Sequence, residues 1–198
     1  MDDSTLLHHY LSLRDREAGK WNLSPASLYV ELETRDYVNS SLDKRPGIRV
    51  LNIGIGTGDW DDFLGFWLDG AGTLMSVDID ERICNLYQYR QSREGHPNPA
   101  HVVCSDILSY TPEEQFDLVT IIGSTMKEIG DYESTLAQCS ALLKPMGQLL
   151  YMDFCSYHPH QQFNESGLRF GLVTDDLRQY TRYERQSFYI MKALKQIG

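Results

Sequence analysis

Short apolar runs alternate with longer amphipathic segments through the middle of the chain. Runs rich in Val, Ile and Leu have the length of buried strands. They lie at about residues 48–53, 73–78, 101–104, 116–122 and 147–154. Helical stretches are expected between them, near residues 59–69, 80–91 and 131–143. Strands and helices that alternate in this way are typical of a doubly wound α/β fold with a parallel sheet, whose strands all end at one edge.

The chain after the fifth run is less regular. Residues 155–167 are polar and aromatic, and we expect a sixth strand at 168–173 and a seventh at 185–194. These two strands would form a C-terminal antiparallel hairpin. The prediction is therefore a mainly parallel seven-stranded sheet with helices on both faces.

The chain before the first run predicts helices. Ser24 and Pro25 form a helix start, with Ser24 as the cap, and that helix extends toward Leu42. The segment from His8 to Trp21 cannot belong to the sheet. Its leucines and Tyr10 suit an amphipathic helix, which either packs on the domain or folds over a ligand as a lid. We interpret residues 1–198 as one domain, with a helical cap or lid at 1–45, a core at 46–154 and a substrate-side part at 155–198.

Length and charge restrict the partners. A chain of 198 residues with 41% hydrophobic content is within the range of one domain with a substantial core. Its net charge of −10 opposes binding to nucleic acid, and we interpret the locally basic residues 169–195 as solvated surface. No apolar run reaches the roughly 20 residues that span a bilayer, and no secretory signal is recognisable. We expect a cytoplasmic protein, monomeric or homodimeric, without membrane or nucleic-acid partners.

Cysteine and histidine spacing predicts no metal site. Cys84, Cys104, Cys139 and Cys155 are scattered, and we interpret them as reduced core thiols. The pair His8–His9 has no carboxylate or cysteine at ligand spacing.

The turn after the first strand carries the most informative pattern. Glycines occupy every second position from Gly54 to Gly58, so the backbone can turn sharply and approach a ligand closely. A dinucleotide-binding turn has its third glycine where Asp59 stands here. Asp61 and Asp62 add further carboxylates to the first turn of the next helix, where they repel a diphosphate. A ligand that carries an ammonium or sulfonium group, such as S-adenosylmethionine, suits this turn better.

Two further acids follow neighbouring strands. Asp78 lies twenty positions past Gly58, about the spacing at which an acid accepts hydrogen bonds from both ribose hydroxyls. Asp106 follows the third run, where a carboxylate can accept a hydrogen bond from the exocyclic amine of adenine.

With these motifs in this order, residues 48–154 resemble the class I S-adenosylmethionine-dependent methyltransferases. Phe116–Ile122 is similar to the fourth strand of that family, and Leu142–Gly147 is similar to its Leu-Lys-Pro-Gly-Gly turn. The resemblance implies that the glycine loop holds the methionine part of the cofactor, that Asp78 holds the ribose and that Asp106 meets the adenine. The cofactor-binding residues that we expect are Asn52, Gly54, Ile55, Gly56, Gly58, Asp59, Asp78, Ile79, Ser105, Asp106, Ile107 and Gly123.

The chain departs from the family pattern at two positions. Asn52 stands where the family usually has an acid, and it carries no charge to pair with the ammonium of the cofactor. Asp59 is available to supply that charge. Met146 replaces a glycine of the turn before the fifth strand, which alters backbone geometry rather than chemistry.

The resemblance implies methyl transfer to a small-molecule O- or N-acceptor, in specialised metabolism. A sulfonium methyl is already activated, so alignment of the two reactants supplies much of the rate, and the need for a base depends on the acceptor. Lys127, Glu128, Asp153 and His158 follow strands four and five and are the catalytic candidates. Histidine titrates closest to neutral pH, although histidines are also common in polar surface loops.

Three other functions stay open. Aminopropyl transfer from decarboxylated S-adenosylmethionine would need an acidic polyamine channel, to which Glu128 and Asp153 could contribute. A noncatalytic module would bind the cofactor without an acceptor. A nicotinamide-dependent oxidoreductase is disfavoured by the missing third glycine. The tyrosines of the C-terminal third either line an aromatic acceptor pocket or pack in the sheet.

Overall fold

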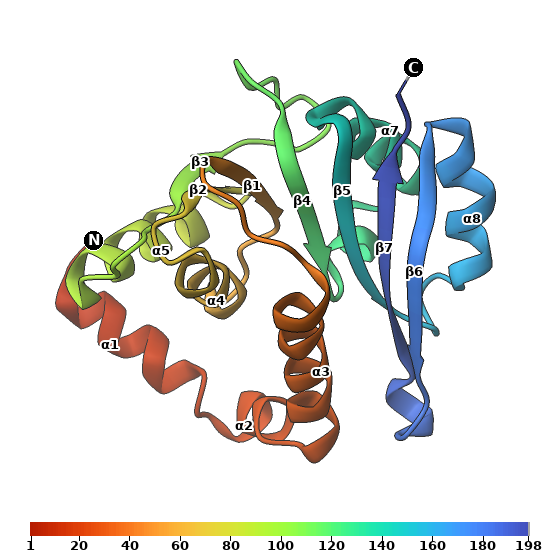
Figure 1. The fold of residues 1–198 in the computed structure, drawn as a ribbon. Helices are drawn as coiled ribbons and strands as arrows, with labels where there is room; N and C mark the ends of the chain where they lie inside the picture. The colour runs from red at the N-terminus through yellow and green to blue at the C-terminus, as the bar shows by residue number, and fades with distance from the viewer. Residues whose placement is uncertain (198) are drawn as a thin grey trace.

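The computed structural model describes residues 1–197, apart from the side chains of Glu17 and Trp21. In that part of the chain, seven strands form one sheet in the order β3-β2-β1-β4-β5-β7-β6 (Figure 1). The strands are β1 (Ile48–Ile53), β2 (Gly72–Asp78), β3 (His101–Cys104), β4 (Phe116–Ile122), β5 (Leu143–Phe154), β6 (Leu172–Tyr180) and β7 (Phe188–Lys195). The first five are parallel, whereas β7 runs antiparallel to both β5 and β6. The predicted fold class is confirmed.

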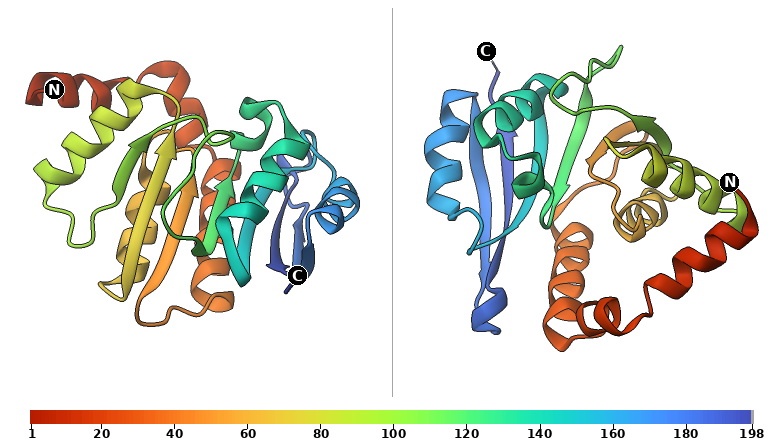
Figure 2. Two further views of the ribbon diagram at one scale, coloured as in Figure 1. Left: turned by 90° about the horizontal axis from the view of Figure 1, so that it is seen from above. Right: turned by 180° about the vertical axis from the view of Figure 1, so that it is seen from behind.

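Helices cover both faces of this sheet (Figure 2). They are α1 (Asp3–Ser12), α2 (Arg16–Asn22), α3 (Pro25–Ser41), α4 (Asp59–Leu68), α5 (Glu81–Glu94), α6 (Thr125–Ile129), α7 (Tyr132–Leu142) and α8 (His160–Arg169), with a 3-10 turn η1 (Glu184–Gln186). Tyr37 of α3 and Leu64 of α4 belong to one buried cluster, and Leu136 of α7 and Phe163 of α8 belong to another. Two apolar cores therefore hold the sheet between helical layers.

The strand order reverses at β1. From β1 the chain moves outward through β2 to β3, and it then crosses back to β4 on the other side of β1. The loops after β1 and β4 consequently diverge at the carboxyl edge of the sheet, where doubly wound folds bind their ligands.

The predicted strands match the structure closely as far as β5. Three of the predicted ranges, 48–53, 101–104 and 116–122, coincide with β1, β3 and β4, while β5 begins earlier than expected, at Leu143. The predicted sixth strand at 168–173 is wrong at its start. Residues 168 and 169 close α8, Gly171 turns the chain with a φ of 72°, and the strand then runs to Tyr180. Residues 169–195 are also not simply solvated surface, because Phe188 and the three residues that follow it are buried in β7.

The N-terminal segment is helical and lies outside the sheet, as expected. Asp3 accepts hydrogen bonds from Tyr89 and Arg93 of α5 at 2.6–2.8 Å, so α1 lies against α5. Leu6 is buried, but Leu7 is 59% exposed, so the expected apolar face packs only in part. That this segment folds over a ligand as a lid stays a prediction.

Two properties of the whole chain complete the description. No helix among residues 1–197 is long and apolar enough to cross a membrane. All four cysteines are free thiols: Cys84 and Cys139 are buried as expected, whereas Cys104 and Cys155 are exposed, so the interpretation as core thiols is wrong for these two.

Candidate functional site

The glycine loop after β1 has a backbone that suits glycine at each of its three positions. Gly54, Gly56 and Gly58 have φ values of 84°, 55° and 79°, a region that other residues rarely adopt. A Cβ at Gly54 would lie 2.7 Å from the side chain of Thr125, so the loop packs closely against α6 there. A Cβ at Gly56 would meet nothing within 4 Å. The loop is therefore tightly packed at its start and open at its middle.

A buried polar network supports this loop from below. The amide nitrogen of Asn52 donates to the Gly54 carbonyl and to Oδ1 of Asp61, each at 2.9 Å. The amide oxygen of Asn52 accepts from the Thr120 hydroxyl at 2.8 Å, and Ser76 donates to the same Oδ1 of Asp61. Asn52 is fully buried, so it shapes the loop rather than lining a surface.

The acid beside Asn52 is Asp61 and not Asp59. Burial raises the pKa of Asp61 to about 7, against the hydrogen bonds from Ser76 and Asn52, and its Oδ2 has no hydrogen-bond partner among the described residues. Asp59 is 61% exposed and accepts from the Thr57 hydroxyl at 2.9 Å. The carboxyl group that Asn52 contacts thus belongs to Asp61, two residues further along α4 than Asp59.

Asp78 connects β2 to the glycine loop. One of its carboxylate oxygens accepts from the backbone N–H of Ile55 at 2.8 Å, and the other accepts from that of Asp80 at 2.9 Å. The first oxygen also accepts from the backbone N–H of Gly56 at 3.5 Å, whereas the oxygen that contacts Asp80 can accept a further hydrogen bond. The same side chain therefore orders the loop and offers acceptors to a ligand.

A pocket of about 250 Å³ opens where the loops after β1, β2, β3 and β4 meet. It brings together six of the predicted cofactor-binding residues with the catalytic candidate Glu128. Its lining is Ile53, Gly54, Val77, Asp78, Ile79, Ser105, Asp106, Ile107, Leu108, Thr125, Glu128 and Ile129. The side chain of Ile79 is 72% exposed, an unusual state for an apolar residue, and Leu108 is 37% exposed. The pocket thus combines carboxylates with two exposed apolar side chains.

Five residues of this lining were not predicted as site residues: Ile53, Val77, Leu108, Thr125 and Ile129. Leu108 lies two residues after the predicted acid Asp106 and belongs to no recognisable motif. Thr125 and Ile129 belong to α6, a five-residue helix too short to show an apolar period. Gly123, which we did predict, has a φ of 76° and turns the chain from β4 toward α6.

A second pocket of about 290 Å³ lies on the other side of the glycine loop. His8 and His9 of α1 line it together with Gly56 and Thr57 of the loop and Arg90 of α5. Helix α1 therefore borders the open middle of the glycine loop.

An acid and a histidine form a close pair at the end of β5. Oδ2 of Asp153 is 2.7 Å from Nδ1 of His158, and the Tyr151 hydroxyl donates to the same oxygen. The backbone N–H of Phe154 donates to Oδ1 at 2.7 Å. Burial raises the pKa of the fully buried Asp153, while the hydrogen bonds from Tyr151 and His158 lower it. The ring of His158 stacks on Tyr132 at 4.7 Å between centroids, so the imidazole is held on two sides.

The other catalytic candidates lie apart from this pair. Glu128 accepts from the Ser124 hydroxyl and lines the first pocket. Nζ of Lys127 is 3.9 Å from the ring centroid of Tyr157, a cation–π contact. Of the four candidates, the structure joins only Asp153 and His158.

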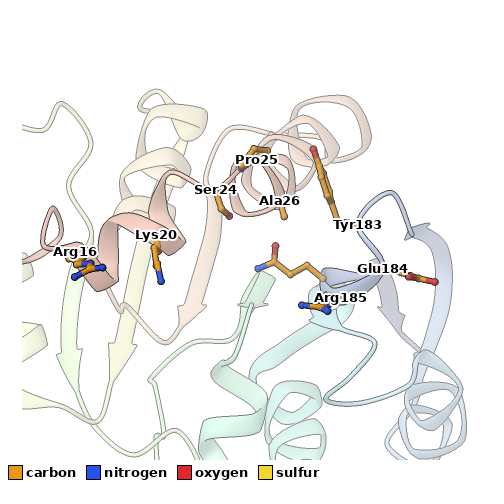
Figure 3. Close-up of a pocket in the computed structure, with 9 residues that line it drawn as sticks. Arg16, Lys20, Ser24, Pro25, Ala26, Tyr183, Glu184 and Arg185 are labelled. Atoms are coloured by element: carbon orange, nitrogen blue, oxygen red, sulfur yellow. The ribbon is translucent and has the colours of Figure 1, made fainter.

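A larger groove of about 1160 Å³ lies between the N-terminal helices and the β6–β7 turn (Figure 3). Its lining residues are Arg16, Lys20, Ser24, Pro25, Ala26, Tyr183, Glu184, Arg185 and Gln186. Of the C-terminal tyrosines, Tyr183 lines this groove, whereas Tyr151 and Tyr189 are fully buried in the core. The groove could not be predicted from the sequence, because its two walls are far apart in the chain.

Residues 50–147 match a family model described as a methyltransferase domain. The chain is 27% identical over 120 residues to the demethylmenaquinone methyltransferase of Staphylococcus haemolyticus, which covers 60% of this chain and 48% of that protein. It is 29% identical over 110 residues to the ubiquinone/menaquinone biosynthesis C-methyltransferase UbiE of Paraburkholderia phytofirmans, covering 56% and 44%. The chain thus spans about half the length of the curated relatives it matches.

Solved structures share the fold. The N-methyltransferase NodS from Bradyrhizobium japonicum, solved with S-adenosyl-L-homocysteine, superposes with a TM-score of 0.68 at 16% identity, covering 98% of this chain and 99% of that one. The [4+2]-cyclase SpnF superposes with a TM-score of 0.70 at 16% identity, covering 84% and 81%. The family model, the curated relatives and the sheet order agree, and the chain belongs to the class I S-adenosylmethionine-dependent methyltransferases.

Proposed function

We propose that this protein transfers the methyl group of S-adenosylmethionine to a small-molecule O- or N-acceptor, with His158 as the base. The observation that carries the proposal is the contact between Asp153 and Nδ1 of His158. A carboxylate at Nδ1 holds the imidazole with a proton on that nitrogen, so Nε2 is left as a proton acceptor. Asp153 is a positioning residue in this scheme.

The residues of the first pocket fit the cofactor. Asp78 offers acceptors for ribose hydroxyls, and Asp106 offers acceptors for an adenine amine. The exposed apolar side chains of Ile79 and Leu108 would cover the faces of the adenine ring. The open middle of the loop at Gly56 leaves room for the methionine part.

The bound cofactor supplies a methyl group that is already activated by its sulfonium. The acceptor loses its proton from oxygen or nitrogen to Nε2 of His158, and its lone pair forms the new bond to the methyl carbon. The carbon–sulfur bond breaks, and its electrons remain on sulfur as S-adenosylhomocysteine. Asp153 stabilises the positive charge that the imidazole gains.

A carbon acceptor is the second candidate. Two of the curated relatives are named for C-methylation in ubiquinone and menaquinone biosynthesis or for methylation of demethylmenaquinone. A phenolic ring carbon becomes nucleophilic when its hydroxyl loses a proton, so the same base would serve. Aminopropyl transfer is less well supported, because the cationic side chains of the large groove would repel a polyamine.

The test compares wild type with His158→Gln and Asp153→Asn. We expect each substitution to lower kcat by about 100-fold, at the lower end of general-base contributions. The affinity for S-adenosylhomocysteine should not change, because neither residue lines the first pocket. Formation of S-adenosylhomocysteine is measured by mass spectrometry with a panel of phenols, amines and quinols.

The control is His160→Gln, a histidine two residues away whose ring contacts Tyr189. It should keep wild-type kcat. Equal kcat in wild type and His158→Gln would exclude His158 as the base.

A further inference from the structure

The large groove gathers cationic side chains in an acidic protein. Arg16 and Lys20 of α2 line one wall, and Arg185 of η1 lines the opposite wall. The net charge of the chain is −10, so a surface with three cations and a single acid, Glu184, is unusual for it. In Figure 3 the Glu184 carboxylate lies beyond Arg185, on the side away from Arg16 and Lys20.

These three cations have no acidic partner among the described residues. Elsewhere in the chain several arginines are paired with acids, among them Arg90 with Asp62, Arg93 with Asp3, Arg169 with Glu133 and Arg178 with Asp176. What distinguishes the groove is that three cations without such a partner line one cavity from two sides.

The groove opens at the same edge of the sheet as the Asp153–His158 pair. Phe188, the first residue of β7, pairs with Phe154 at the end of β5, so η1 lies just beyond the carboxyl edge. The end of α2 and the start of α3 face η1 across the groove (Figures 1 and 3). The groove and the proposed base therefore lie at the same edge of the sheet.

The remaining lining is apolar or neutral. Pro25, Ala26 and the ring of Tyr183 offer contact to an apolar body, and Ser24 and Gln186 offer hydrogen bonds. Guanidinium groups form paired hydrogen bonds with carboxylate and phosphate oxygens. An ammonium group on a flexible stem adds charge to the same anion.

We propose that this groove binds the methyl acceptor by an oxyanion, a carboxylate or phosphate, that Arg16, Lys20 and Arg185 hold. The apolar body of the acceptor packs against Pro25, Ala26 and Tyr183. This inference rests on the proposed function, because it assigns the substrate class of the same active site.

The test measures binding rather than turnover. The probes are 4-hydroxybenzoate, 4-hydroxyphenyl phosphate and the uncharged 4-hydroxybenzamide, each titrated by NMR into the protein saturated with S-adenosylhomocysteine. We expect either anion to bind at least about tenfold more tightly than the amide, since a charge-assisted contact is worth about this factor or more. Arg16→Gln/Lys20→Gln/Arg185→Gln should abolish that preference.

The matched control is Arg14→Gln. Arg14 is an exposed cation of the same segment that does not line the groove, so this variant should keep the preference for anions. The triple variant should keep the affinity for S-adenosylhomocysteine, which shows that it folds. Which of the two anions binds more tightly identifies the source of the oxyanion.

Three outcomes would overturn the inference. They are equal binding of the amide and the anions, an unchanged preference in the triple variant, and tighter binding of anionic lipid vesicles or of a short RNA than of either small anion. The proposed function has a separate readout. If the anions bind as expected but no S-adenosylhomocysteine forms with any acceptor, the proposal of methyl transfer is contradicted and the proposal of an anion site is still supported.

Discussion

At the scale of single residues, Asn52 and Asp61 divide a task that the family usually gives to one acid. The amide of Asn52 contacts the loop. The carboxyl group is that of Asp61, on the first turn of α4, where it is buried and accepts a hydrogen bond from the same amide. Its unpartnered Oδ2 indicates that the neutral, protonated form fits this position well. The loop is therefore supported by a neutral amide, with a buried carboxyl group behind it.

The buried Asp61 predicts how stability depends on pH. Its pKa is raised from 3.8 to about 7, so between these values the folded protein holds a proton that the unfolded chain has released. The free energy of unfolding then falls as pH rises through this window. Relative to Asp61→Asn, which has no such proton, wild type should lose on the order of a few kcal/mol between about pH 5 and about pH 8.

Urea denaturation of both proteins at several pH values measures this difference. Parallel pH dependences of the two proteins would show that Asp61 does not hold a proton in the folded state. A loss of stability in wild type at the acidic end instead would reverse the sign and contradict burial as the dominant cause.

At the scale of elements, the glycine loop separates the needs of folding from those of binding. A Cβ at Gly54 would overlap Thr125, whereas one at Gly56 would point into open space. Gly56→Val should therefore fold, with about 1–2 kcal/mol of backbone strain from its positive φ, and should lose affinity for S-adenosylhomocysteine.

Calorimetric titration and circular dichroism check this prediction together. Gly54→Val serves as the comparison, because it should lose much more stability through the clash with α6. A folded Gly56→Val protein that binds S-adenosylhomocysteine as tightly as wild type would remove the loop from the binding site.

The sequence predicted the elements whose pattern is local. Strand β4 is a mainly apolar run, and the Gly54–Gly58 turn is visible in five consecutive residues, so both could be located without a structure. Helix α8 was missed because two of its three buried residues are Ser166 and Gly167, which carry no hydrophobic signal. The groove was missed for another reason. Arg16 and Arg185 are far apart in the sequence, and only the folded chain brings them to one groove.

The Asp153–His158 pair is an intermediate case. Both residues were among the candidates, but four candidates at one edge of a sheet could not be ranked from spacing alone. The structure distinguishes them because Lys127 contacts Tyr157 and Glu128 faces the first pocket.

At the scale of the whole molecule, α1 links the cofactor region to α5 by surface contacts. Asp3 pairs with Arg93, Tyr10 donates to Glu94, and the inner side of α1 borders the glycine loop. Arg93→Ala should weaken this attachment and raise the dissociation rate of S-adenosylhomocysteine about two- to fivefold, the range for an exposed ion pair.

Stopped-flow displacement measures that rate, and hydrogen exchange in residues 3–12 reports the attachment itself. Arg14→Gln, which leaves the α1–α5 contact intact, is the control. If exchange in α1 rises in Arg93→Ala while the dissociation rate stays the same, α1 packs on the domain without acting as a lid.

The two walls of the groove come from opposite ends of the chain. Residues 16–26 and 183–186 line it, and none of its described lining residues belongs to the sheet core at 46–154. Substitutions there leave the strands, the glycine loop and Asp78 untouched. With the acceptor held in this groove as we propose, acceptor preference can diverge by changes in these two segments while the glycine loop is inherited intact. An engineer could then exchange the two segments to redirect the enzyme without redesigning its fold.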